Sequence, residues 1–164
     1  MILIGIGGNL DSPRFGPPRE TLTAALAMLD RESISILARS GLYRSEPVPR
    51  SNQPWFVNAV ISVATELSAS ELLAKLQRLE MRFGRVRGER NAARILDLDL
   101  LDYEGAVMHT PTLVLPHPRL HERRFVLVPL VGIAPGWQHP ILGVSAAELL
   151  ARLPPDQQVE PLPC

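Results

Sequence analysis

Leucine and aspartate alternate in one stretch of the chain, and this alternation limits how the stretch can fold. The run is Leu96-Asp-Leu-Asp-Leu100. Successive side chains of a β-strand point to opposite faces of a sheet, so Asp97 and Asp99 share one face and the leucines share the other. The sequence therefore predicts a strand with one apolar face and one acidic face.

Two carboxylates on one face of a strand are a candidate site for a hard cation. Residues two apart on a strand are separated by about 6.6 Å, and leaning side chains can bring their carboxylates onto shared ions. Mg²⁺ prefers oxygen ligands and usually takes one or two carboxylates, with phosphates and waters completing its shell. An edge strand with a solvated acidic face is the alternative. We favour the magnesium site because of the residues that precede the strand.

Arginine is concentrated in the segment just before these aspartates. Lys75 is the sole lysine, so nearly all positive charge in the chain is carried by guanidinium groups, although a genome-wide preference for arginine would have the same effect. Guanidinium groups bind phosphate oxygens in a forked geometry that lysine cannot reproduce. The crowded arginines are Arg78, Arg82, Arg85, Arg87, Arg90 and Arg94.

Length and composition indicate a single globular domain, residues 1–164, in the cytoplasm. Of the 164 residues, 46% are apolar and 21% charged, as in soluble globular proteins. Apolar runs stay below the about 20 residues that cross a bilayer, and the amino terminus lacks a basic signal-peptide start. Cys164 is the sole cysteine, which excludes an intrachain disulfide. A net charge of zero argues against coating of nucleic acid or an anionic membrane.

Hydrophobic periodicity predicts the order of the elements. Strands are expected over 1–7, 33–43, 56–65 and the aspartate run, with one or two short strands over 106–115. Pro17-Pro18 suits the start of a first helix. A capping box over Ser68–Glu71 suits the start of a second helix, which is expected to end at Gly84. Gly7-Gly-Asn9 reads as a turn or a place where a ligand approaches the backbone. Residues 45–55 form a proline-rich loop, 120–133 are partly helical, Ser145 begins a last helix, and 154–164 form a mobile tail.

The order strand, helix, strand, strand, helix, strand is that of a ferredoxin-like βαββαβ core. The predicted fold class is therefore α+β, with a mainly antiparallel sheet and helices on both faces in α/β/α layers. Asn58 falls on the strand face that carries Phe56 and Val60, where an amide is most often a satisfied structural group unless a pocket lies there. Gln77 and Glu80 lie beside the apolar stripe of the second helix and are expected to face solvent.

A third signal, Pro116-His117 followed by Arg119, Arg123 and Arg124, completes a set typical of phosphoryl transfer. In that chemistry carboxylates hold Mg²⁺ and arginines hold phosphate oxygens, so the protein contributes positioning and electrostatic stabilisation. The chain has neither a Walker-type Gly-Lys-Ser/Thr loop nor a kinase glycine-rich loop, which argues against a P-loop enzyme.

These motifs resemble the successive signatures of the 6-hydroxymethyl-7,8-dihydropterin pyrophosphokinase family of folate biosynthesis. The resemblance runs in order from the first strand to about Pro135. The Arg-x-x-Asp-x-Asp and Pro-His-Pro-Arg segments are its most specific parts. The matching stretches are Gly5-Ile-Gly-Gly-Asn-Leu10, Tyr43-Arg-Ser-Glu-Pro47, Phe56-Val-Asn-Ala59, Glu80 through Gly84-Arg-Val-Arg87, Arg94-Ile-Leu-Asp-Leu-Asp-Leu100 and Pro116-His-Pro-Arg-Leu-His-Glu-Arg-Arg-Phe125.

The resemblance implies Mg²⁺-dependent transfer of the β,γ-diphosphate of ATP to the hydroxymethyl group of the reduced pterin, with release of AMP. It implies a monomer that binds these two small molecules and neither nucleic acid nor membrane. Asp97 and Asp99 match the family's ligands for two magnesium ions. The implied catalytic residues are these two aspartates together with Arg85 and Arg94. Implied ATP contacts are Gln77, Glu80, Arg87, Arg94, Leu98, His117 and Arg123. Implied pterin contacts are Ser45, Pro47, Val48, Phe56, Asn58 and Phe125.

Three positions depart from the family pattern. The loop near Asn91 is one residue shorter than in some members and lacks their tryptophan, Phe56 replaces a tyrosine, and Glu46 stands where a proline can occur. Two other functions fit parts of the sequence. An RNA-binding module on a ferredoxin-like fold would need exposed aromatics, which total only 5% of residues here. A Mg²⁺-dependent nucleotidyltransferase could use the same aspartates but would release pyrophosphate.

Overall fold

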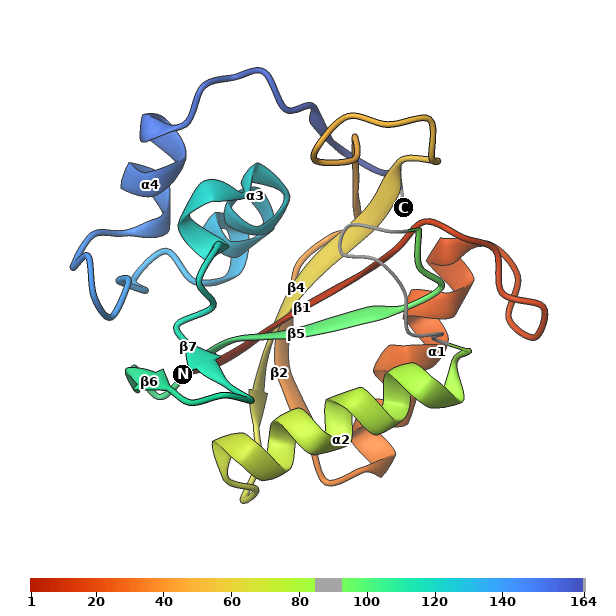
Figure 1. The fold of residues 1–164 in the computed structure, drawn as a ribbon, viewed down its shortest axis with the longest axis horizontal. Helices are drawn as coiled ribbons and strands as arrows, with labels where there is room; N and C mark the ends of the chain where they lie inside the picture. The colour runs from red at the N-terminus through yellow and green to blue at the C-terminus, as the bar shows by residue number, and fades with distance from the viewer. Residues whose placement is uncertain (85–92, 164) are drawn as a thin grey trace.

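A six-stranded sheet lies between two pairs of helices in the computed structural model, which describes residues 1–84 and 93–163 (Figure 1). None of the helices in these residues has both the length and the apolar character needed to cross a bilayer. The strands are β1 (Ile2–Gly8), β2 (Ser35–Arg39), β3 (Tyr43–Ser45), β4 (Phe56–Ala64), β5 (Asp97–Tyr103), β6 (Met108–His109), β7 (Val114–Leu115) and β8 (Val159–Pro161). The helices are α1 (Pro18–Arg31), α2 (Ala69–Arg82), the 3₁₀ turn η1 (Leu120–Glu122), α3 (Arg124–Ile133) and α4 (Ala146–Arg152).

The sheet has the topology expected for a ferredoxin-like core. Its central order is β5-β1-β4, and every pairing in it is antiparallel. On the other side of β4, β2 pairs with its second half and β3 with its first half. Read through β2, the order β5-β1-β4-β2 is that of a βαββαβ unit. The fold class predicted from the sequence is therefore confirmed, while β6 and β7 form a separate two-stranded sheet.

The sheet separates two apolar cores, because its strands alternate between its two faces. One core packs under α1 and α2 and includes Ile61 of β4 and Leu98 of β5. The other packs under α3 and α4 and includes Val60 of β4 and Leu101 of β5. The three predicted helix starts are confirmed: Pro18 occupies the first turn of α1, Ser68 and Glu71 form a reciprocal capping box on α2, and Ser145 caps α4.

The single strand predicted over 33–43 is wrong, since the structure divides this segment into β2 and β3. Ser40 lies at the break and still bonds to β4. Its backbone N–H donates to the Val60 carbonyl at 2.9 Å, but the Val60 N–H donates to the Ser40 hydroxyl at 3.0 Å and not to a backbone carbonyl. A side-chain acceptor that replaces a ladder carbonyl locally interrupts the strand.

The mobile tail predicted over 154–164 also differs from the structure, in which Val159–Pro161 forms β8 along the edge of β3. Proline is acceptable there, because the N–H that it lacks can face away from the ladder on an edge strand. Composition favoured a tail, but the available sheet edge decides the conformation.

Gly8 is the last residue of β1 and allows the start of β5 to approach closely. A Cβ atom built on Gly8 would clash with the backbone carbonyl oxygen of Ile95. Gly8 therefore serves close packing of the chain against itself, and Gly7 lies at the pocket described below.

We predict that Gly8→Ala lowers the free energy of unfolding by about 1–3 kcal/mol, as overpacking does elsewhere. Urea denaturation followed by circular dichroism measures it. Gly41→Ala is the matched control, since nothing lies within 4 Å of a Cβ at Gly41. Equal stability of the two variants would contradict this account of the contact between Gly8 and Ile95.

Candidate active site

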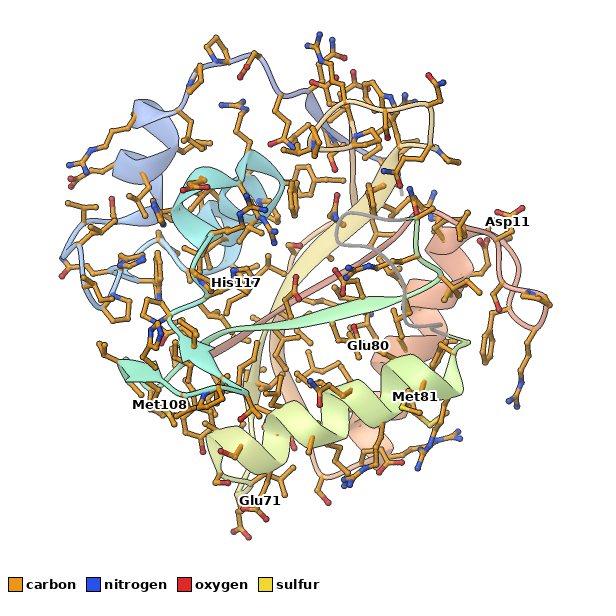
Figure 2. All side chains as sticks on the ribbon, in the orientation of Figure 1. Asp11, Glu71, Glu80, Met81, Met108 and His117 are labelled. Atoms are coloured by element: carbon orange, nitrogen blue, oxygen red, sulfur yellow. The ribbon has the colours of Figure 1, made fainter. Side chains whose placement is uncertain are left out.

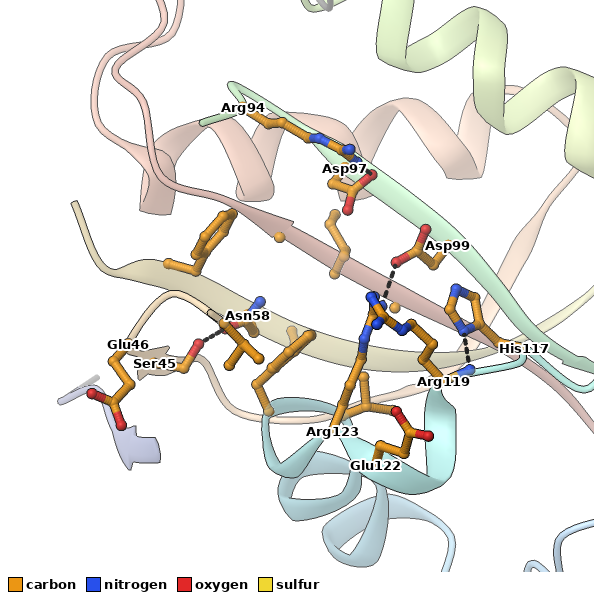
Figure 3. A pocket seen from close by; sticks show the side chains of 18 of the residues that line it. Ser45, Glu46, Asn58, Arg94, Asp97, Asp99, His117, Arg119, Glu122 and Arg123 are labelled. Carbon is orange, nitrogen blue, oxygen red and sulfur yellow. Dashed lines mark hydrogen bonds and ion pairs between the residues drawn. The ribbon is translucent and has the colours of Figure 1, made fainter. Parts of the chain in front are cut away.

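A pocket of about 660 Å³ opens on the sheet face that also carries α3, between β5 at one end and β3 at the other (Figure 3). Ten of the residues singled out from the sequence line it. Those at the β5 end are Arg94, Asp97, Asp99, His117 and Arg123. Those at the β3 end are Ser45, Val48, Phe56, Asn58 and Phe125.

The two aspartates lie on one face of β5, as the alternation predicts, with Leu98 between them in the core on the other face. In the antiparallel register, Asp97 is paired with Gly7 and Asp99 with Gly5 on β1. Directly paired residues share a face, so both carboxylates have a glycine as their neighbour. The absence of side chains at Gly5 and Gly7 leaves room beside the carboxylates, and both glycines line the pocket.

Each aspartate is accompanied by an arginine. The Arg94 Nη1 donates to Asp97 Oδ1 at 2.8 Å, and the Arg123 Nη1 lies 3.8 Å from Asp99 Oδ2 (Figure 3). Burial lowers the pKa of Arg123, the neighbouring Asp99 acts in the opposite direction, and Arg119 adds to the lowering. Cations crowded in a partly buried pocket favour an anionic ligand with several oxygens, such as a polyphosphate.

Asn9 fixes the place where the arginine segment enters β5. It is buried, and it exchanges two bonds of 2.8 Å with Arg94: its backbone N–H donates to the Arg94 carbonyl, and its Oδ1 accepts from the Arg94 N–H. Its Nδ2 donates to Gln53 Oε1 and to the Pro54 carbonyl, each at 2.9 Å. One side chain therefore connects β1, the proline-rich loop and the start of β5.

The β3 end of the pocket presents an oriented amide, and two phenylalanines also line the pocket. The Ser45 hydroxyl donates to Asn58 Oδ1 at 2.5 Å, which fixes the direction of the amide (Figure 3). A Cβ atom on Gly7 would lie 2.7 Å from Asn58 Nδ2, so the amide extends over the glycine. Phe56 and Phe125 line the pocket together with Asn58. Asn58 is thus in a pocket, the condition under which a ligand-binding role was expected.

At the other end, His117 lies beyond Asp99, on the side away from Arg94 (Figure 3). Its Nδ1 accepts from the Arg119 N–H at 3.1 Å, so the proton of a neutral ring is on Nε2. The backbone N–H of His117 donates to the Leu101 carbonyl of β5 at 2.9 Å. These bonds orient the ring next to the aspartate strand.

Sequence reasoning missed several residues that line the pocket. Glu122 was missed although it lies in the recognised stretch that begins at Pro116, and Gly5 is recognised as a pocket residue only when the register with β5 is known. Arg119, which the sequence indicated as part of the phosphoryl-transfer signal, lines the pocket, and so does Gly7. The other lining residues are Ile6, Glu46, Pro49, Ala59, Pro118 and Val126.

Other singled-out residues lie off the pocket. Glu80 was expected to face solvent, and this is wrong: it is 3% exposed, lies on the side of α2 that faces β5 and accepts from the Leu98 N–H at 2.8 Å (Figure 2). An unpaired N–H next to the aspartates would be costly in the core, which explains the buried carboxylate.

Gln77 is exposed on α2, as expected. Pro47 is buried without lining the pocket. The predictions for Arg85 and Arg87 and for the shortened loop at Asn91 lie outside the described residues.

The carboxylate pair fits Mg²⁺ in the kind and number of its donors. Among residues 1–84 and 93–163 no group of three or more His, Cys, Asp or Glu side chains gathers for a metal. Mg²⁺ does not need such a cage, because it is typically bound through one or two carboxylates, with substrate phosphates and waters as the other ligands. Asp97 and Asp99, which line the pocket, supply that partial set.

Comparisons with known proteins agree with this geometry. The chain is 40% identical over 153 residues to the 2-amino-4-hydroxy-6-hydroxymethyldihydropteridine pyrophosphokinase of Methylorubrum extorquens, covering 93% of this chain and 92% of that protein. The protein of the same name from Haemophilus influenzae is 42% identical over 132 residues, 80% of this chain and 79% of its own.

Longer proteins also match. The chain is 34% identical over 161 residues to the folic acid synthesis protein fol1 of Pneumocystis carinii, covering 98% of this chain but only 21% of that protein. A crystal structure of Plasmodium falciparum HPPK-DHPS with pteroate aligns with a TM-score of 0.70 at 12% identity, covering 92% of this chain and 42% of that one. The structural likeness supports the fold alone.

Residues 3–135 match the family described as 7,8-dihydro-6-hydroxymethylpterin-pyrophosphokinase (HPPK). The match begins in β1, includes the aspartate strand and the Pro-His-Pro-Arg segment, and ends just after α3. It covers well over half of the chain. This chain therefore belongs to the 7,8-dihydro-6-hydroxymethylpterin-pyrophosphokinase family.

Proposed function

We propose that the protein transfers the β,γ-diphosphate of ATP to the hydroxymethyl group of 6-hydroxymethyl-7,8-dihydropterin in folate biosynthesis, giving the pterin diphosphate and AMP. Family membership and the names of the relatives support the reaction. The observation that carries it is the division of one pocket into two ends. Carboxylates and arginines occupy one end, and an amide oriented by Ser45 occupies the other, with two phenylalanines also lining the pocket. We further propose that the chain is one domain, acts as a cytoplasmic monomer and binds neither nucleic acid nor membrane.

The amide end suits the pterin. A pterin is a flat heteroaromatic ring with donors and acceptors along its edge, so it can stack on Phe56 and Phe125. Asn58 offers both a donor and an acceptor to that edge, and Ser45 holds it in one orientation. Val48 lines the same end of the pocket. Pro47 is buried beside it without lining the pocket, so it remains a pterin contact proposed from the family resemblance alone.

The acidic end suits Mg²⁺ bound with a triphosphate. Asp97 and Asp99 would hold the ions, two in our proposal. When bound, Mg²⁺ screens phosphate charge and lowers the pKa of a coordinated hydroxyl. Because both carboxylates line one pocket, cations that they held would lie in the same space as the proposed phosphate and pterin positions.

The arginines exchange partners when nucleotide binds. Arg94 and Arg123 are paired with the two aspartates in the structure, and their guanidinium groups would be available to phosphate oxygens if the carboxylates held Mg²⁺ instead. With His117 they would stabilise charge on the transferred group and on departing AMP. Arg85 and Arg87 remain proposed contacts. Gln77, Glu80 and Leu98 do not line this pocket, so they remain nucleotide contacts that the family resemblance alone supports.

Purified protein with ATP, Mg²⁺ and the pterin is expected to form AMP and the pterin diphosphate, measured by chromatography of both products. The pocket could also serve other phosphate chemistry, and the products distinguish the reactions. Release of ADP would indicate an ordinary kinase, and release of pyrophosphate a nucleotidyltransferase. Salt-sensitive RNA binding without ATP turnover would favour an RNA-binding module.

We expect Asp97→Asn and Asp99→Asn each to lower kcat at least about 100-fold, because each removes a carboxylate for Mg²⁺ and transition-state charge stabilisation is worth several kcal/mol. Steady-state AMP formation measures the loss, and circular dichroism checks the fold. Asp30→Asn on the exposed end of α1 is the matched control. Wild-type rates in either pocket variant would refute the metal assignment.

Arg94→Ala is expected to lower kcat by about 100- to 1,000-fold, equivalent to about 2.7–4 kcal/mol for a lost charge-stabilising donor. Pterin affinity, measured by calorimetry with an ATP analogue present, should change little because Arg94 lies at the phosphate end. Arg31→Ala, at the end of α1, controls for loss of an exposed arginine. A large loss of pterin affinity without loss of kcat would contradict the role.

A further inference from the structure

The C-terminal segment lies against the outer edge of the pterin end of the pocket. β8 pairs with β3 through Val159 opposite Ser45, which itself lines the pocket. The Leu162 N–H adds a bond of 2.8 Å to the Leu42 carbonyl just before β3. The strand that carries Ser45 is thereby held between β4 on one side and β8 on the other. We call residues 156–162 the strap.

Glu46 connects the strap to the pocket loop. Its N–H donates to the Gln158 carbonyl at 3.2 Å, and its Oε1 accepts from the Gln158 N–H at 2.8 Å. Its Oε2 lies 3.3 Å from the Arg50 Nε, and Arg50 also donates to the Asp156 carbonyl at 3.2 Å. The loop that carries Val48 is therefore attached to the strap at both Glu46 and Arg50.

The strap also reaches the opposite wall of the pterin end. Arg124, the first residue of α3, donates from its Nε to the Gln157 carbonyl at 3.1 Å. Its neighbour Phe125 lines the pocket and is a proposed stacking surface for the pterin. One short segment thus contacts both the loop at Glu46 and the helix start at Phe125, which enclose the proposed pterin site.

Glu46 lines the pocket, and its carboxylate contacts the strap. Figure 3 shows its side chain turned away from Asn58 and the aspartates. The side chain is only 11% exposed and both its oxygens have partners in the strap or on Arg50. A charged acceptor bonded in this way strengthens the attachment relative to a neutral one.

We propose that the strap, through Glu46 as a positioning residue, fixes the pterin end of the pocket and sets pterin affinity. The inference rests on the proposed function. A loop already held in its binding conformation loses less conformational entropy when the ligand binds, so the attachment favours binding. The phosphate end is held by β5 and by Asn9, which bonds the far end of the same loop at Gln53 and Pro54, so ATP binding should depend much less on the strap than pterin binding does.

The test uses full-length variants on each side of one hydrogen bond. Glu46→Ala removes the acceptor, Gln158→Pro removes the backbone donor, and Glu46→Gln keeps an acceptor oxygen. Glu66→Ala, at the far end of β4, is the matched control. Calorimetry with a non-hydrolysable ATP analogue and Mg²⁺ measures the Kd of the pterin, steady-state kinetics give KM for each substrate, and circular dichroism checks the fold.

We expect Glu46→Ala and Gln158→Pro each to raise the pterin Kd about tenfold, the effect of one hydrogen bond to a charged group. The variant that combines Glu46→Ala with Gln158→Pro should also raise the pterin Kd about tenfold and not about a hundredfold, because both changes break the same bond. Glu46→Gln should stay within about threefold of wild type. KM for ATP should change less than about twofold in all of them, since β5 and Asn9 hold the phosphate end.

Three results would overturn the inference. A pterin Kd in Glu46→Ala equal to that in Glu66→Ala would show that the bond has no effect. A loss of pterin affinity in Glu46→Ala but not in Gln158→Pro would mean that Glu46 acts on the pterin directly. Equal weakening of ATP binding and pterin binding would mean that the variants destabilise the whole protein. Active wild type with unaffected variants overturns this inference alone, whereas wild type that forms no AMP overturns the proposed function and the inference with it.

Discussion

The site depends on the pairing of β5 with β1, in which two aspartates face two glycines. Because the register places Gly7 beside Asp97 and Gly5 beside Asp99, the carboxylates adjoin open space on a face that is otherwise packed by α3 and α4. The same alternation directs Leu98 into the opposite core. One strand therefore contributes to stability and to chemistry at once, and a shift of one residue would bury the acids and expose the leucines.

Around this pair, separate connections hold the two ends of the pocket. Asn9 bonds β1, the proline-rich loop and the entry to β5, so the phosphate end is tied to the sheet. The strap attaches the same loop at its other end through Glu46. The loop is thus fixed near both of its ends, at Gln53 and at Glu46, while the segment between them stays near the solvent. Such a loop can adjust over a bound ligand and exclude water without losing its attachment.

Local patterns in the sequence predicted much of this arrangement. The faces of β5, the capping box of α2 and the element order of the ferredoxin-like core follow from periodicity within single segments, and the structure confirms them. What escaped prediction depends on partners far away in the chain. Asn9 bonds residues that are 44 and 85 positions away in the chain. Glu80 accepts a hydrogen bond from the N–H of Leu98, 18 residues later, and is buried there. β8 forms because β3 has an edge with which it can pair.

The central claim is that Asp97 and Asp99 hold magnesium around a triphosphate and release their arginines to the phosphates. A crystal structure with Mg²⁺, a non-hydrolysable ATP analogue and the pterin tests it most directly. The account predicts metal density between both carboxylates and the phosphate oxygens, with Arg94 and Arg123 moved from the carboxylates onto phosphates. Carboxylates that stay paired with these arginines, with the metal bound elsewhere, would contradict it.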